Sequence, residues 1–169
     1  FFTTASGAGY GLIFLMALYG AMDGVPADPW FGAIGLGLGT VLVTGGLLSS
    51  TAHLGHPERA WRAYSQWKSS WLSREGVLAV IVMAGLAGWF AAGYSGTIVP
   101  IWANLLLLVL IYLTVYATSM IYASLKTVAR WYHPLTPVCY LMFAAAGGLL
   151  AVLAMLALLG LPITAALAQ

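Results

Sequence analysis

The chain has 169 residues, of which 62% are hydrophobic and only 6% are charged, whereas about 25% of the residues of an ordinary soluble domain are charged. Its six basic and four acidic side chains are too few to cover the surface of a water-soluble fold of this length. The composition therefore excludes a soluble globular domain. Asp, Glu, Lys and Arg are absent from four long stretches, residues 1–22, 29–52, 76–125 and 131–169.

These uncharged stretches predict transmembrane helices, because a helix needs about 20 apolar residues to cross the hydrocarbon core. We predict an all-α, polytopic transmembrane helix bundle that forms a single domain over residues 1–169, with about five spans. The first stretch has no basic region before it, so we interpret it as a span and not as a signal peptide. In chain order, the expected spans are residues 5–22, 30–52, 76–92, 101–125 and 135–160.

The two longer polar loops, 53–75 and 126–134, are separated by two expected spans and should therefore lie on one side of the membrane. They contain all six Lys and Arg residues, and the opposite loops, 23–29 and 93–100, contain none. Basic residues concentrate in the cytoplasmic loops of membrane proteins. We therefore expect both polar loops and the N-terminus in the cytoplasm, although basic residues can also cluster to bind a partner.

His53 stands where the second span reaches the membrane surface, and Gly55 and Pro57 end that helix. A half-buried imidazole that titrates near neutral pH is suited to bind a quinone carbonyl and to pass on its proton. The alternative is an interfacial histidine in contact with lipid headgroups. His56 and His133 lie at the same face, but both precede prolines in loops, so we expect no metal or haem site.

Glu75 opens the uncharged stretch 76–125. On a structural interpretation Ser73 caps the third span, and the helix dipole favours an acid in the first turn. On a functional interpretation Glu75 carries protons beside a quinone, because ionisable groups at the membrane edge are costly and often functional. His53 closes one span and Glu75 opens the next at the same surface, so one pocket can contain both.

Basic and aromatic side chains alternate through the loop 53–75. Membrane anchoring by aromatic rings and basic side chains explains this pattern, and the alternative is a docking surface for a peripheral subunit. The candidate docking residues are Arg59, Arg62, Lys68 and Arg74, interleaved with Trp61, Tyr64, Trp67 and Trp71.

The second polar loop carries further basic and aromatic residues. Lys126 and Arg130 are four residues apart, the spacing of neighbours on a helix face. Tyr122, Trp131 and Tyr132 lie near the same interface, where their planar rings can flank a quinone.

Two blocks of this sequence resemble the membrane-anchor subunit of dimethyl-sulfoxide-reductase-type molybdoenzymes. The first block contains His53-Leu-Gly-His-Pro-Glu-Arg-Ala-Trp-Arg-Ala and Ser69-Ser-Trp-Leu-Ser-Arg-Glu75. The second contains Tyr122-Ala-Ser-Leu-Lys-Thr-Val-Ala-Arg-Trp-Tyr, with Thr136-Pro137 after it. The resemblance spans most of residues 1–145.

The resemblance implies a complex in the bacterial inner membrane. A molybdopterin catalytic subunit would exchange electrons through an iron–sulfur subunit with this anchor, and the anchor would exchange them with ubiquinone or menaquinone. It further implies a longer, eight-span anchor without haem, in which His53 and Glu75 handle quinol. The single cysteine, Cys139, agrees with this picture, because iron–sulfur clusters take several cysteine ligands and would belong to the partner.

The basic loops on the expected cytoplasmic side make the chain most similar to the sulfite-oxidising branch, which reduces quinone. The expected function is electron transfer from a docked iron–sulfur subunit to quinone, coupled to sulfite oxidation. The alternatives are an anchor that oxidises menaquinol for an S- or N-oxide reductase, a purely structural anchor, and a small transporter. A transporter needs polar groups at mid-membrane, but Asn104 and the few hydroxyl groups of the spans lie near helix ends or occur singly.

Overall fold

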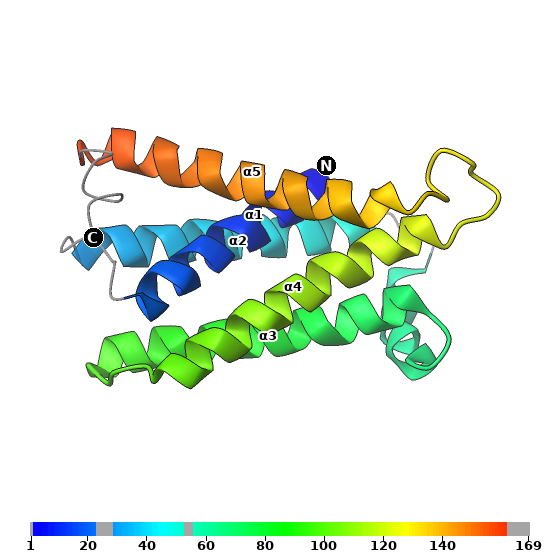
Figure 1. The fold of residues 1–169 in the computed structure, drawn as a ribbon. Helices are drawn as coiled ribbons and strands as arrows, with labels where there is room; N and C mark the ends of the chain where they lie inside the picture. Colours follow the sequence, from blue (N-terminus) through cyan, green and yellow to red (C-terminus); the bar gives the residue numbers. More distant parts are fainter. Residues whose placement is uncertain (1, 23–28, 53–55, 162–169) are drawn as a thin grey trace.

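The computed structural model describes residues 2–22, 29–52 and 56–161. Within these residues the chain forms five α-helices and one 3₁₀ helix, shown in Figure 1. They are α1 (Phe2–Ala21), α2 (Pro29–Ala52), the 3₁₀ helix η1 (Pro57–Gln66), α3 (Trp71–Ser95), α4 (Ile101–Ala123) and α5 (Leu135–Leu158). Each of the five α-helices in this part of the chain is long and apolar enough to cross a membrane. The predicted all-α bundle is confirmed.

The helices lie side by side, with α1 in contact with α2, α4 and α5, and with α3 packed mainly against α4 (Figure 1). One end of the bundle holds η1, the start of α3 and the turns between α4 and α5, and we call it the η1 end. The opposite end holds the turn between α3 and α4. The two polar segments therefore lie together, as the number of spans predicts.

The turn between α3 and α4 ends one helix and starts the next within five residues, Gly96–Pro100. Gly96 takes a left-handed conformation with φ 69°, and the Thr97 N–H donates to the Ala92 carbonyl at 2.9 Å, which is a Schellman C-cap. Pro100 stands at the N-cap of α4, where its missing N–H removes no helical hydrogen bond. The turn expected at 93–100 is present but shorter.

The start of α3 differs from the prediction. The helix begins at Trp71 and not at Gly76, and its N-cap is Ser70, whose Oγ accepts a hydrogen bond from the Ser73 N–H at 3.4 Å. Ser73, the expected cap, is a buried residue inside the helix. Either serine suits a cap by type, but the extended backbone of Ser70, with φ −113° and ψ 125°, makes it the cap. Glu75 consequently lies in the second turn, inside the helix.

The segment 124–134 also differs from the prediction. α4 ends at Ala123, and the backbone then forms successive tight turns, in which Val128 N–H donates to the Leu125 carbonyl and Trp131 N–H to the Val128 carbonyl. These bonds reach three residues back, whereas α-helical bonds reach four. Lys126 and Arg130 therefore do not share a helix face.

Small residues bring α1 close to its neighbours. A Cβ atom on Gly148 of α5 would overlap the backbone of Gly11 on α1. On the other side of α1, a Cβ atom on Gly39 would lie 2.5 Å from Ile13 Cγ1, and one on Gly35 would lie 2.6 Å from Met16 Sδ. Close approach at small residues is typical of helix packing in lipid, so Gly35 and Gly39 are packing positions.

Candidate functional site

Glu75 is buried inside the helix bundle, with only 4% of its surface exposed. Its carboxyl group has one hydrogen-bond partner among the described side chains, the Thr118 hydroxyl of α4, at 2.7 Å from Oε1. A buried carboxylate is costly unless it is paired or hydrogen-bonded, and acids inside transmembrane helices are commonly functional. This environment differs from that of an exposed acid at a helix N-terminus.

The Thr118 hydroxyl contacts two oxygen atoms, Glu75 Oε1 and the Thr114 carbonyl oxygen, which lies at 3.0 Å. A hydroxyl group has one proton to donate and two lone pairs to accept with. Beside an ionised carboxylate Thr118 donates to Glu75, and beside a protonated acid it accepts from Glu75 and donates to Thr114. The pair can therefore exist in either protonation state without moving a side chain.

Arg74 is next to Glu75 in sequence but does not neutralise it. The Arg74 side chain donates from Nε to the Trp67 carbonyl at 3.1 Å and from Nη2 to the Lys68 carbonyl at 2.9 Å. Its guanidinium carbon lies 4.3 Å from the centre of the Trp71 ring, within the range of a cation–π contact. Arg74 thus holds the segment between η1 and α3 against the first turn of α3.

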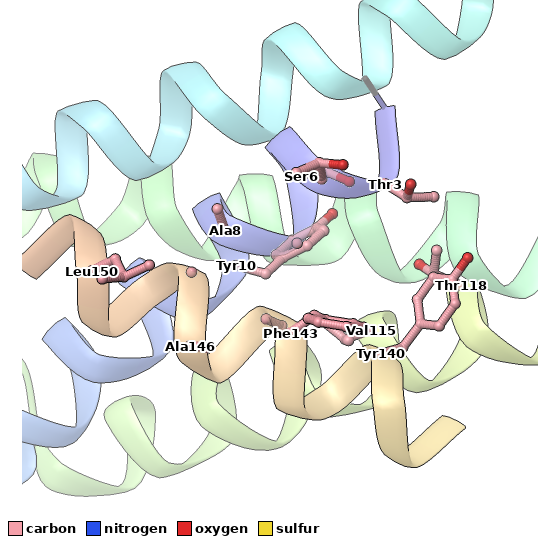
Figure 2. Close-up of a pocket in the computed structure, with 14 residues that line it drawn as sticks. Thr3, Ser6, Ala8, Tyr10, Val115, Thr118, Tyr140, Phe143, Ala146 and Leu150 are labelled. Carbon is pink, nitrogen blue, oxygen red and sulfur yellow. The ribbon is translucent and has the colours of Figure 1, made fainter. Parts of the chain in front are cut away.

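A cavity of about 570 Å³ lies between α1, α4 and α5 and includes Thr118 in its wall. Figure 2 shows Tyr10 of α1, Thr118 of α4 and Tyr140 of α5 around this space. Most of the remaining wall is apolar, from Val115 and Phe143 among others. Thr118 therefore both lines the cavity and bonds to the buried acid, whereas Glu75 is not part of the cavity wall.

Tyr10 of α1 is a second polar residue in the wall of this cavity. Its side chain is 2% exposed, and its hydroxyl has no hydrogen-bond partner within the described part of the chain. A buried hydroxyl without a partner destabilises a fold by about 1–3 kcal/mol, and the Tyr10 side chain borders the cavity.

Of the three aromatic residues predicted to flank a quinone, Tyr122 and Trp131 lie together, and no ring contact is found for Tyr132 within the described part of the chain. The Tyr122 ring lies edge-on to the Trp131 ring, with 5.2 Å between centroids, and stacks on the Tyr140 ring at 5.4 Å. Of Tyr122, Trp131 and Tyr140, only Tyr140 lines the cavity. Tyr122 and Trp131 therefore support Tyr140 at the η1 end and do not themselves form the cavity wall.

The other predicted site residues are spread over the η1 end. Arg59, Arg62 and Lys68 are exposed, as the docking prediction needs, and the Arg62 guanidinium lies 5.6 Å from the Trp61 ring centre. His53 lies outside the described residues, so its predicted proximity to Glu75 stays a prediction. No group of three or more His, Cys, Asp or Glu in residues 2–22, 29–52 and 56–161 is placed to hold a metal ion.

Three residues of the site were missed from the sequence: Tyr10, Thr118 and Tyr140. A signal for Tyr10 is present, because Thr3, Ser6 and Tyr10 follow helical spacing along one face of an otherwise apolar helix, and all three line the cavity. For Thr118 the signal is weaker. Threonine tolerates an apolar helix by donating to a backbone carbonyl one turn earlier, so its presence alone does not indicate a site.

The sequence matches a known family over almost its whole length. Residues 2–168 match the family of the DMSO reductase anchor subunit (DmsC). A subunit of the sulfite dehydrogenase of Allochromatium vinosum is 38% identical over 180 residues, which cover 96% of this chain and 55% of that protein. The chain thus spans about half the length of this relative, and no solved structure matches it. As its two sequence blocks predicted, the chain belongs to the family of DMSO reductase anchor subunits.

Proposed function

We propose that this chain is the quinone-reactive part of a membrane anchor that passes electrons from a docked iron–sulfur subunit to quinone during sulfite oxidation. The observation that carries the proposal is the buried Glu75, whose hydrogen-bond partner Thr118 lies in the wall of a cavity of about 570 Å³. Membership of the anchor family supports the role in a complex. The name of the Allochromatium vinosum relative supports the sulfite-oxidising direction.

The residues around the cavity fit a quinone. Binding sites for small molecules are commonly about 300–1,000 Å³ in volume and apolar, with a few placed polar groups, and this cavity has both properties. The unsatisfied Tyr10 hydroxyl can donate to a ring carbonyl, and the Phe143 and Tyr140 side chains offer flat apolar surfaces. When bound, a quinone accepts two electrons and two protons.

Glu75 and Thr118 supply one route for these protons. The carboxyl group holds a proton at Oε1, 2.7 Å from the Thr118 hydroxyl. Because Thr118 bonds to Glu75 and belongs to the cavity wall, its hydroxyl can accept this proton and give its own to a quinone oxygen that reaches it. Such positioned proton transfer commonly accelerates a reaction by about 10²–10⁴-fold. His53 is the predicted second proton group.

The η1 end is the docking surface of this proposal. Arg59, Arg62 and Lys68 are exposed there together with Trp61 and Trp67, and arginine and aromatic residues are enriched at protein interfaces. The iron–sulfur subunit would dock on this surface on the cytoplasmic side of the bacterial inner membrane, with the molybdopterin catalytic subunit beyond it. A topology reporter fused in the segment 124–134 tests this side, and a periplasmic signal would favour the menaquinol-oxidising alternative.

The decisive experiment replaces Glu75 by glutamine in the purified complex. Glutamine keeps the size and an acceptor for Thr118 but cannot carry the proton. Sulfite-driven reduction of decylubiquinone should fall by about 100-fold, while sulfite oxidation with a soluble electron acceptor should stay unchanged. The second assay shows that the complex is assembled and active. Normal quinone reduction by Glu75→Gln would refute the proposed proton route.

A further inference from the structure

A second cavity lies at the end of the bundle opposite to η1. It has a volume of about 310 Å³ and is formed by α3, α4 and the turn between them. Its wall shares no residue with the cavity beside Thr118. Its wall includes small residues, one indole ring and one amide, from Gly85, Gly88, Trp89, Ala92, Ala103 and Asn104.

Asn104 is the buried polar residue of this wall, which also includes Thr97, a residue whose hydroxyl is bonded to Ser95 Oγ. It lies in the first turn of α4, it is 5% exposed, and its Oδ1 atom has no hydrogen-bond partner among the described residues. Within a membrane-spanning helix such an amide has little access to bulk water, and an unsatisfied buried amide oxygen destabilises the fold by about 1–3 kcal/mol. The cavity wall thus contains a buried amide whose oxygen has no hydrogen-bond partner among the described residues.

The glycines around Asn104 show where the cavity is open. Toward α1 the packing is close, because a Cβ atom on Gly20 would lie 3.7 Å from both Asn104 Nδ2 and Trp89 Cζ2. Toward α3 the space is open, because a Cβ atom on Gly88 would meet nothing within 4 Å and one on Gly85 would meet only Leu107 Cδ1, at 3.6 Å. A ligand can therefore lie over the glycines with its polar end at Asn104.

The chemistry of the wall defines the ligand. It contains no Asp, Glu, Lys, Arg or His, so it does not suit an ion. The Asn104 amide has donors and an acceptor, and the Trp89 ring and the small residues offer apolar contact. These features suit a hydrophobic molecule that carries one hydroxyl or carbonyl oxygen.

We propose that this cavity is a second binding site, for a hydrophobic molecule whose hydroxyl or carbonyl oxygen bonds to the Asn104 amide. Two components of the membrane have this chemistry, the ring of a quinone or quinol and the ester and glycerol region of a lipid. The site uses no residue of the cavity beside Thr118. It does not depend on the function proposed for that cavity. It would give the anchor a ligand on the membrane side opposite to Glu75.

Binding to the delipidated complex tests the site. The complex would be purified from its own membranes and stripped of lipid with detergent. Decylubiquinone and phosphatidylglycerol would then be added separately, and bound molecules counted by native mass spectrometry. Asn104→Leu should bind one molecule fewer than the unchanged complex, of decylubiquinone if the ligand is a quinone and of phosphatidylglycerol if it is a lipid.

A pair of glycine variants separates binding from folding. Gly88→Leu should fill the cavity and abolish the same binding event while Asn104 stays in place. Gly93→Leu is the matched control on α3, because a Cβ atom at Gly93 also meets nothing within 4 Å and Gly93 is outside the cavity wall. It should bind as the unchanged complex does.

The results of these binding experiments can be distinguished from a failure of the function proposed for the cavity beside Thr118. Loss of one decylubiquinone in Asn104→Leu and Gly88→Leu, with sulfite-driven quinone reduction retained, supports a quinone at this site. Loss of one phosphatidylglycerol instead supports a lipid. If both variants bind both molecules as the unchanged complex does, or if the unchanged complex binds neither probe at a site sensitive to Asn104, the proposal is wrong.

Discussion

The contact between α1 and α5 is closed at one place and open at the next. At Gly11 and Gly148 the two backbones meet, and even a methyl group would overlap. Around this crossing, the cavity of about 570 Å³ lies between the same helices and α4, with the buried Tyr10 and the exposed Phe143 in its wall. Glycine lets transmembrane helices touch, whereas a large buried side chain such as Tyr10 needs space between them. Side-chain size along a single interface thus separates the part that holds the bundle together from the part that can bind a ligand.

The largest effect is expected from a substitution at the tight crossing of α1 and α5. Gly148→Ala places a methyl group against the Gly11 backbone, and we expect it to lower the free energy of unfolding by about 3 kcal/mol, because neither backbone can move aside freely. Thermal unfolding in detergent measures this. Gly37→Ala is the control, since a Cβ atom there meets nothing within 4 Å. It should be neutral or stabilising, because alanine favours a helix, and equal loss in both variants would contradict the packing argument.

An intermediate effect is expected from a substitution at Thr118, in the wall of the cavity. Thr118→Val removes the hydroxyl that bonds to Glu75 and keeps the size of the side chain. We expect quinone reduction to fall about ten-fold, equivalent to about 1.4 kcal/mol of activation free energy, since water must then replace the hydroxyl. Steady-state sulfite:decylubiquinone assays measure the change.

Thr114→Val is the matched control for that experiment. Thr114 lies one turn earlier on α4, is fully buried, and donates to the Leu110 carbonyl at 2.7 Å. Its hydroxyl does not contact Glu75, so quinone reduction should stay within two-fold of the unchanged complex. Equal losses in both threonine variants would indicate a general effect on α4 and not a proton route.

The smallest effect is expected at Tyr10. Tyr10→Phe removes a hydroxyl that has no partner in the described residues, so the ligand-free complex should be as stable as the unchanged one or more stable by about 1 kcal/mol. The apparent KM for decylubiquinone should rise a few-fold, because the quinone loses one donor. Thermal unfolding without quinone and KM measurements together test this, and a stability loss without a KM change would exclude Tyr10 as a quinone ligand.

Composition was sufficient to predict the bundle. The spans follow from stretches that lack charge, and their order places both polar segments at one end. Helix boundaries were harder, because Ser70 and Ser73 are equally suited to cap α3 and only the backbone conformation distinguishes them. Lys126 and Arg130 have helical spacing but lie in turns, since spacing alone does not make a segment helical.

The site could be predicted only where a residue is unusual for its surroundings. Glu75 stands out as an acid at the start of a long uncharged stretch. Its partner Thr118 is 43 residues away and ordinary in an apolar helix. Tyr140 likewise becomes a site residue only because α5 packs beside α1 and α4. Such pairings depend on how helices rotate against one another, which the local pattern of a single sequence does not encode.

The Arg74 side chain bears on how an electron donor would be positioned. By bonding the Trp67 and Lys68 carbonyls while it lies on the Trp71 ring, it joins the residues that follow η1 to the helix that carries Glu75. These contacts restrain the surface segment against the helix that carries the buried acid, and so favour a constant separation between a redox centre seated on η1 and the cavity. The rate of electron tunnelling falls exponentially with the distance between donor and acceptor. A restrained distance between η1 and the cavity would therefore make this rate insensitive to motions of the surrounding membrane.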